Sequence, residues 1–260
     1  MQFNFLIDFI KHRISANNRH GTHSPFVYKL ADEVIYNFKE NEDSKIIEKH
    51  RISLLNDNRA LNITDLGAGS LLNKETSKKV KEVAANALKK PALAQLLYRL
   101  SKYFNPSSII ELGTCLGITT AYFAKANPNA KIITIEGCPQ TGSIAAEGFN
   151  EMGLKNVELL IGNFDNVLPE VLKTINPLDF VYVDGNHRKD ATLNYFEWCL
   201  ANKNDDTVLI FDDIYWSKGM KEAWEEIKNH HEVTVTIDMF WIGLVFFRKG
   251  QAKEHFKLKY

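Results

Sequence analysis

The sequence predicts an α/β fold: a doubly wound, mostly parallel sheet that ends in an antiparallel hairpin. Two observations carry this prediction. After residue 91, five short apolar runs alternate with stretches of helical periodicity, the pattern of parallel strands that are buried on both faces. The last two apolar runs are separated by only a few residues, and so short a connection permits only an antiparallel pair. Five alternating units and a hairpin predict seven strands.

The elements follow in order from this pattern. A helix is expected to begin at Pro91, because proline suits the first helical turn. Apolar residues then recur at helical spacing, at Leu93, Leu96, Leu97, Leu100 and Phe104. The expected parallel strands lie at about 109–112, 131–135, 157–161, 179–183 and 207–211, with helices at about 118–126, 141–152, 166–174 and 190–201. A further helix around Trp224 precedes the hairpin strands, at about 232–237 and 243–248.

The residues before Pro91 are expected to form a helical extension, which divides the chain into a first part, 1–90, and a second part, 91–260. One amphipathic helix is predicted by an apolar stripe of Leu6, Phe9, Ile10 and Ile14. Another is predicted over 80–88, and its solvated side is expected to carry most of a lysine cluster, Lys74, Lys78, Lys79 and Lys81.

The composition is that of an ordinary globular chain. Its 260 residues are 45% hydrophobic, enough for a sizeable core. Thirty-two basic residues balance thirty-two acidic ones, so neither nucleic acid nor a membrane is an expected partner. Three widely spaced cysteines without a Cys-x-x-Cys pair indicate a reducing compartment. A cytoplasmic location is expected, because we find no secretion signal and no apolar run of the ~18 residues that span a bilayer.

A glycine-containing turn follows the first parallel strand. The stretch reads Ile-Ile-Glu-Leu-Gly-Thr-Cys-Leu-Gly over residues 109–117, and the next strand ends at Glu136. Gly113 and Gly117 can take positive φ and let the backbone approach a ligand closely. Glu136 can accept both hydroxyls of a ribose. The pair predicts a nucleotide-type cofactor, although the middle glycine of the Gly-x-Gly-x-x-Gly fingerprint of nicotinamide sites is missing.

Three carboxylates follow the last two parallel strands. Asp184 comes after the fourth strand, and Asp212 and Asp213 come after the fifth. Because the carboxyl ends of adjacent parallel strands open onto one crevice, these side chains are expected to converge. Like charges at close range need neutralising, and a hard divalent cation with oxygen ligands does this. The pattern therefore predicts either a metal site or a metal-free polar site.

His187 lies three residues beyond Asp184 on the same loop. A neutral imidazole is suited to take a proton from a hydroxyl group, which makes His187 the candidate base. Arg188 and Lys189 are alternatives for this role. A metal that lowers the pKa of the hydroxyl would make a strong base unnecessary.

Together these segments resemble a class I S-adenosylmethionine-dependent O-methyltransferase with a Rossmann-like core. The motifs that carry the resemblance are Glu111-Leu-Gly-Thr-Cys-Leu-Gly117, Glu136, Gly162-Asn-Phe-Asp165, Tyr182-Val-Asp-Gly-Asn-His187 and Phe211-Asp-Asp213. The similarity covers about residues 91–249. It is closest to the branch of small-molecule and sugar O-methyltransferases with an Asp-Gly-x-His motif, and it is more distant to catechol O-methyltransferase, which has Asn in place of Asp213.

The resemblance implies S-adenosylmethionine as cofactor, Mg²⁺ or a similar divalent cation, and a small-molecule hydroxyl as methyl acceptor. A homodimer is left open. The cofactor residues that it implies are Glu111, Gly113, Thr114, Gly117, Glu136, Asn163, Phe164 and Asp184. The metal ligands are then Asp184, Asp212 and Asp213, and the catalytic residues are His187 and Asp184.

Several alternatives stay open on the sequence alone. The chain could be a nicotinamide-dependent oxidoreductase, or a cofactor-binding interaction protein without catalysis. An upstream segment, Thr64–Ser70, also matches the acid-x-Gly-x-Gly pattern, but no strand ending in an acid follows it. His20 and His23 would face the substrate if the extension folds over the crevice. Trp216 is either a wall of the acceptor site or a core aromatic.

Overall fold

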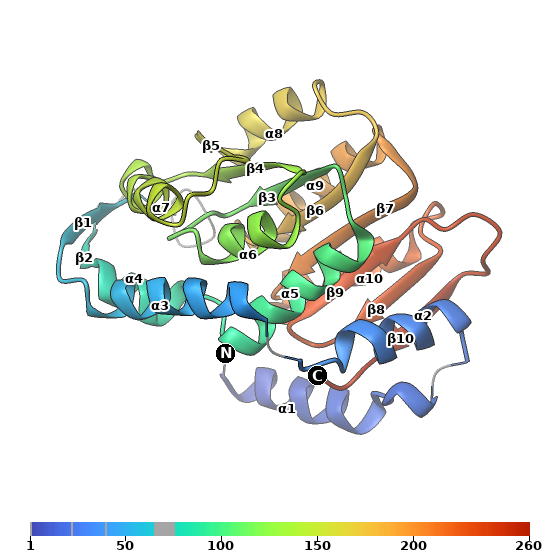
Figure 1. Cartoon of the computed structure of the whole chain (residues 1–260). Helices are drawn as coiled ribbons and strands as arrows, with labels where there is room; N and C mark the ends of the chain where they lie inside the picture. Colours follow the sequence, from blue (N-terminus) through green and yellow to red (C-terminus); the bar gives the residue numbers. More distant parts are fainter. Residues whose placement is uncertain (1, 22, 40, 65–75) are drawn as a thin grey trace. The chain divides into compact units, whose positions relative to one another are not determined.

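The structure is a computed structural model that describes residues 2–21, 23–39, 41–64 and 76–260. The chain divides into two compact units. Unit 1 comprises residues 1–37 and 169–260, and unit 2 comprises residues 38–168. Figure 1 draws their elements in sequence colours.

Unit 2 contains three parallel strands in the order β3-β4-β5. They are β3 (Ser108–Leu112), β4 (Lys131–Glu136) and β5 (Val157–Ile161). The helices that alternate with them are α5 (Pro91–Phe104), α6 (Ile118–Ala126) and α7 (Pro139–Glu151), and α8 (Phe164–Leu172) begins in this unit. Every residue of β3 is buried, as expected for a parallel strand that is covered on both faces.

The first part of unit 2 adds α3 (Glu42–Asn56), α4 (Val80–Ala87) and an antiparallel pair, β1 (Ala60–Ile63) and β2 (Thr76–Lys79). One apolar cluster joins these elements to α5 and α6, through Ile47, Leu54, Val80, Ala94 and Tyr122 among others. Lys78 and Lys79 lie on β2, so the predicted placement of these lysines along a helix was wrong.

Unit 1 contains five strands in the order β10-β8-β9-β7-β6. They are β6 (Leu178–Val183), β7 (Lys203–Asp212), β8 (Val235–Asp238), β9 (Ile242–Phe246) and β10 (Glu254–Lys257). β6 and β7 are parallel, while β9 pairs antiparallel with both β7 and β8. The helices α9 (Lys189–Leu200) and α10 (Lys218–Asn229) alternate with the strands.

The first 37 residues belong to this same unit. They form α1 (Gln2–Ser15), a 3₁₀ turn (Arg19–Gly21), α2 (Pro25–Leu30) and a π-helical turn (Ala31–Ile35). The ring of Phe26 in α2 contacts that of Phe246 at the end of β9, with centroids 5.0 Å apart. None of the helices in the described ranges is sufficiently long and apolar to cross a bilayer.

The predicted fold class is confirmed: strands and helices alternate as expected, and β8 and β9 form the terminal hairpin. Apart from the β1–β2 pair, the three parallel strands of unit 2 and the five strands of unit 1 give eight within the described residues, one more than the predicted seven. The addition is β10, which pairs parallel with β8. Nothing tests the predicted division at residue 90 into an extension and a main domain, which stays a prediction.

Helix α1 exists as predicted, but it buries a different face. Leu6, Ile10 and Ile14 are 54%, 49% and 79% exposed. The side that packs inward carries Phe9 of the predicted stripe together with Phe5, and their rings contact Phe240 at centroid distances of 5.1 and 5.0 Å. Aromatic contacts with a loop more than 200 residues away therefore decide the orientation of this helix.

Candidate active site

The turn after β3 has the backbone that its glycines predict. Gly113 and Gly117 have φ of +101° and +79°, and Cys115 between them has φ of +51°. A Cβ on Gly117 would lie 2.6 Å from the ring of Phe149. Both the conformation and the space at position 117 thus require glycine.

Glu136 ends β4 with both carboxylate oxygens held by backbone amides. Its Oε2 accepts from the amide of Cys115 at 2.7 Å, and its Oε1 accepts from the amide of Cys138 at 2.8 Å. Burial raises the pKa of Glu136, although these hydrogen bonds oppose the shift. The hydroxyl of Thr141 and the amide of Gly137 also hydrogen-bond to this carboxylate, so the side chain is held in one orientation.

Glu111 and Thr114 belong to a buried network at the end of β3. Glu111 is completely buried, and its Oε2 accepts from the hydroxyls of Thr134 (2.7 Å) and Thr120. The hydroxyl of Thr134 also lies 2.6 Å from that of Thr114. These contacts fix the start of the glycine turn from within. A direct contact of Glu111 or Thr114 with a cofactor stays a prediction.

The segment after β5 joins the same strand ends. The amide of Gly162 donates to the carbonyl of Glu136 at 2.9 Å, which places Asn163 and Phe164 directly after that contact. The side-chain oxygen of Asn163 accepts from the amide of Asp165 at 2.9 Å and so caps α8. The structure thus brings the segments that follow β3, β4 and β5 together around Glu136.

The predicted acidic cluster assembles in unit 1. Nε2 of His187 lies 3.8 Å from Oδ1 of Asp184 and 3.8 Å from Oδ2 of Asp213. The hydroxyl of Tyr182 donates toward Oδ1 of Asp212 (3.1 Å) and Oδ2 of Asp184 (3.3 Å). Each of the three carboxylates therefore lies near the Tyr182 hydroxyl or the His187 imidazole. Tyr182 was not among the predicted site residues.

No metal centre is formed in the described part of the chain: none of its groups of three or more His, Cys, Asp or Glu side chains could hold a metal ion as arranged. The donor set nevertheless suits a hard cation, because three carboxylates gather around one phenol and one imidazole. A metal on these residues stays a proposal.

The loops that carry the cluster are held in unusual conformations. Asn186 and Asp213 have φ of +51° and +54°. The side-chain amide of Asn186 donates to the hydroxyl of Tyr195 at 2.8 Å, and the amide of Asp213 donates to the carbonyl of Trp241 at 2.7 Å. Left-handed backbone in non-glycine residues persists only where the surroundings impose it. Such loops hold His187 and Asp213 in place.

The other candidate bases are engaged elsewhere. Nζ of Lys189 lies 2.6 Å from Glu226 and 3.3 Å from Glu222 of α10, and these carboxylates raise its pKa. A lysine stabilised as a cation is a poor proton acceptor. Arg188 donates from Nε to Oδ1 of Asn186 at 2.8 Å and supports the loop.

The remaining candidates are only partly placed. Trp216 is 47% exposed, so it is not a packed core aromatic. His23 is exposed, whereas the side chain of His20 lies outside the described part of the chain. Residues 65–70 of the upstream glycine segment also lie outside the described ranges. Pro25 opens α2, and the hydroxyl of Ser24 just before it receives a hydrogen bond from Gln251.

A second group that the sequence does not reveal anchors α1 beside the Asp213 loop. Nε2 of the buried His12 lies 3.0 Å from Oδ1 of Asp238, and the hydroxyl of Tyr215 donates to Oδ2 of Asp238 at 2.7 Å. The Tyr215 ring stacks on Phe240 at 4.7 Å. Because Tyr215 follows Asp213 by two residues, α1 supports the loop that carries that carboxylate.

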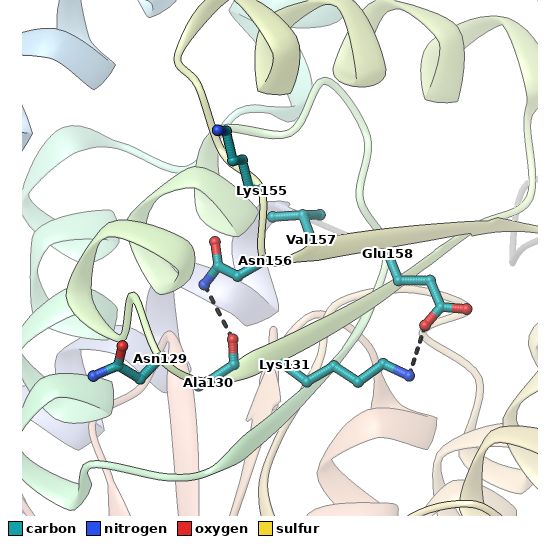
Figure 2. Close-up of a pocket in the computed structure, with 7 residues that line it drawn as sticks. All are labelled: Asn129, Ala130, Lys131, Lys155, Asn156, Val157 and Glu158. Atoms are coloured by element: carbon teal, nitrogen blue, oxygen red, sulfur yellow. Dashed lines mark hydrogen bonds and ion pairs between the residues drawn. The ribbon is translucent and has the colours of Figure 1, made fainter.

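The hollow of about 330 Å³ shown in Figure 2 lies at the opposite ends of β4 and β5, where these strands begin. Lys131 and Glu158 pair across it at 2.8 Å. The side-chain amide of Asn156 donates to the carbonyls of Ala130 and Asn127, at 3.1 and 3.0 Å. These contacts are structural, and the candidate cofactor residues lie at the other ends of the strands.

Comparisons with known proteins agree with this arrangement. Residues 110–214 match the family model described as a methyltransferase domain. A catechol O-methyltransferase of Niastella koreensis is 28% identical over 127 residues, which cover 48% of this chain and 57% of the relative. An O-methyltransferase imqG of Aspergillus flavus is 27% identical over 40% of this chain and 44% of the relative. The chain thus spans only about half the length of these curated relatives.

Solved structures share the fold over most of the chain. An O-methyltransferase from Bacillus cereus in complex with SAH has a TM-score of 0.56 at 17% identity, covering 84% of this chain and 94% of that one. The SAH-bound Podospora anserina methyltransferase has a TM-score of 0.60 at 13% identity and covers 88% and 100%. Residues 110–214 thus match a methyltransferase domain, and solved methyltransferase structures share the fold over most of the chain.

Proposed function

We propose that this protein transfers the methyl group of S-adenosylmethionine to a hydroxyl oxygen of a small molecule, with assistance from a divalent cation. The observation that carries the proposal is Glu136, whose carboxylate is fixed at the end of β4 by the amides of Cys115 and Cys138. The names of the relatives support oxygen as the acceptor atom. No observation favours a nicotinamide oxidoreductase or a non-catalytic binding protein.

In this proposal, unit 2 binds the cofactor. Glu136 accepts the two ribose hydroxyls, Gly113 and Gly117 let the backbone approach the methionine part, and Asn163 and Phe164 flank the adenine. The bound sulfonium supplies an electrophilic methyl group. The residues of the glycine turn contribute mainly alignment, because methyl transfer depends on near-attack geometry.

Replacing Glu136 with alanine is expected to raise the Kd for S-adenosylhomocysteine by about 100-fold, since each charge-assisted hydrogen bond to a ribose hydroxyl contributes roughly 1.5–3 kcal/mol. Calorimetric titration measures this change.

The burial that raises the pKa of Glu136 also predicts that the affinity for S-adenosylhomocysteine depends on pH. The affinity for S-adenosylhomocysteine should fall as the pH decreases, and the fall should begin at a higher pH than the ordinary pKa of a glutamate would give. The reason is that only the ionised form accepts both hydroxyls. Glu136→Gln should remove this pH dependence. Equal affinity of wild type and Glu136→Ala would exclude the ribose role.

Unit 1 is proposed to hold the cation and the acceptor hydroxyl. Asp184, Asp212 and Asp213 would bind Mg²⁺ or a similar ion, which as a Lewis acid lowers the pKa of a bound hydroxyl. His187, within 3.8 Å of two of these carboxylates, takes the proton that the hydroxyl loses. The new bond joins the acceptor oxygen to the methyl carbon, and the bond between that carbon and sulfur breaks.

Asp184→Asn is expected to raise the Kd for Mn²⁺ at least tenfold, because the substitution removes a charged oxygen ligand. Titration monitored by the electron paramagnetic resonance signal of free Mn²⁺ measures it. A matched control is Asp190→Asn, which changes an exposed acid a few residues away at the start of α9. Absence of any Mn²⁺ binding by the wild-type protein at millimolar concentration would refute the metal.

We also propose that the N-terminal extension, residues 1–90, acts as a lid that completes the binding site of the methyl acceptor. The contacts of α1 support this: His12 reaches Asp238, and Asp8 pairs with Lys221 of α10. Lids of this kind exclude water and finish a catalytic constellation. The homodimer and the cytoplasmic location stay predictions.

The decisive test of the function is a methyl-transfer assay. Purified protein, S-adenosylmethionine labelled in its methyl group, and Mg²⁺ are incubated with a panel of phenols, catechols and sugars, and labelled ethers are identified by mass spectrometry. Transfer to nitrogen or carbon acceptors alone would overturn O-methylation. Stabilisation by NADH but not by S-adenosylmethionine would overturn the methyltransferase assignment itself.

A further inference from the structure

We propose that Tyr182 is a positioning residue that orients Asp184 and Asp212 for a divalent cation. This inference rests on the metal-assisted function proposed above. It concerns a residue that touches neither cofactor nor substrate in that proposal, and it assigns the residue a role through its two carboxylate neighbours.

The strand register brings these three residues together. β6 and β7 are parallel, with Tyr182 opposite Ile210 and Val183 opposite Phe211. Side chains two residues apart on a strand point to the same face, so Tyr182 and Asp184 share a face. Asp212 lies two residues beyond Ile210 and shares that face from the neighbouring strand. Tyr182 is completely buried beneath the two acids.

The phenol hydroxyl lies within hydrogen-bonding distance of both carboxylates. It is 3.1 Å from Oδ1 of Asp212 and 3.3 Å from Oδ2 of Asp184. A phenol has one hydrogen to donate, so this group satisfies only one of the two acids at a time. Asp212 is only 1% exposed, so water screens its charge little. The phenol keeps the two acids close enough to share one cation.

The hydroxyl also fixes the rotation of the Asp184 carboxylate. The two oxygens of Asp184 face different partners, because Oδ2 lies toward Tyr182 and Oδ1 lies 3.8 Å from Nε2 of His187. Without the phenol hydroxyl, one of these two constraints on the carboxylate is lost. Groups that orient metal ligands in this way typically account for 10- to 100-fold in metal affinity.

The test is Tyr182→Phe, which removes only the hydroxyl. Tyr122→Phe is a matched control, since Tyr122 is also completely buried and donates to a carboxylate, Oε1 of Glu48 at 2.8 Å. For both variants and the wild type, the Kd for Mn²⁺ is measured by electron paramagnetic resonance, the Kd for S-adenosylhomocysteine by calorimetry, and Tm by scanning calorimetry. We expect Tyr182→Phe to raise the Mn²⁺ Kd by about 10- to 100-fold with an unchanged S-adenosylhomocysteine Kd. Tyr122→Phe should lower Tm without changing the Mn²⁺ Kd.

The outcomes separate this inference from the proposed function. If the wild-type protein binds no Mn²⁺, the metal-assisted function fails and the role of Tyr182 fails with it. If the wild type binds Mn²⁺ and Tyr182→Phe binds it equally well, only the role of Tyr182 fails. A weaker Mn²⁺ affinity in both tyrosine variants, or a parallel loss of S-adenosylhomocysteine affinity in Tyr182→Phe, would indicate general loosening of the fold and would also overturn the assignment.

Discussion

Replacing His187 with alanine is expected to lower kcat by about 10²- to 10⁴-fold, the usual contribution of a general base, while the Kd for S-adenosylhomocysteine stays unchanged. The physical reason is that Nε2 of His187 lies 3.8 Å from both Asp184 and Asp213, where it can take the proton of a hydroxyl that binds at these carboxylates. Single-turnover rates of methyl transfer measure the effect on chemistry directly.

Lys189→Ala is the matched control, because Lys189 lies two residues away and was the alternative base. Its ammonium group is paired with Glu222 and Glu226 on the protein surface, and such exposed pairs contribute little. The control should keep a near wild-type kcat. An unchanged rate in His187→Ala, together with an inactive Asp184→Asn, would mean that the cation alone activates the hydroxyl and that no protein base is used.

Replacing Asp238 with asparagine is expected to lower the free energy of unfolding by about 1.5–3 kcal/mol, the usual contribution of a hydrogen bond to a charged group. Asp238 is 2% exposed and accepts from Tyr215 and the amide of Phe240, while His12 lies 3.0 Å away. Urea denaturation monitored by tryptophan fluorescence measures the loss. Asp32→Asn, which breaks an exposed pair with Arg19, should cost no more than about 1 kcal/mol.

The same residue predicts a pH dependence of stability. Burial alone would raise the pKa of Asp238, but hydrogen bonds from His12, the Phe240 amide and Tyr215 outweigh it and hold the pKa below its ordinary value. A carboxyl with a lowered folded-state pKa stabilises the protein above its ordinary pKa, and this contribution disappears as the pH falls through the lowered value. The difference in the free energy of unfolding between wild type and Asp238→Asn should therefore be largest at neutral pH and should decrease at acidic pH. A constant difference down to pH ~3 would exclude this linkage.

The parts of the fold that were predicted well are those fixed by local pattern. The strand at Val157–Ile161 and the helix at Ile118–Ala126 lie at the predicted residues, because apolar runs and glycine boundaries mark them. β10 was missed because Glu254–Lys257 contains no apolar run, and backbone pairing with the edge of β8 creates this strand. The face of α1 was wrong because both of its sides carry apolar residues. Only its distant partners, Phe240 and Trp241, select one of them.

The candidate site was predictable to a similar degree. The rule that parallel strand ends share one edge correctly groups Asp184 with Asp212 and Asp213. Tyr182 was detectable in principle, because the two-residue period of a strand puts it on the same face as Asp184. The pairing of His12 with Asp238 was not detectable, since no local pattern links residues 226 positions apart. Contacts between residues far apart in the sequence, such as His12 and Asp238, thus help to support the loop that carries Asp213.

The discontinuous composition of unit 1 has a consequence for synthesis on the ribosome. Unit 2 is one continuous stretch, whereas residues 1–37 lack their partners in unit 1 until residues 169–260 have been made. Asn17, for example, pairs with Lys257 and Lys259. Until then, Phe5 and Phe9 remain uncovered, and nascent chains with exposed aromatic surface are prone to aggregate or to recruit chaperones. Helix α1 is therefore made before the rest of unit 1 and docks only after residues 169–260 have followed.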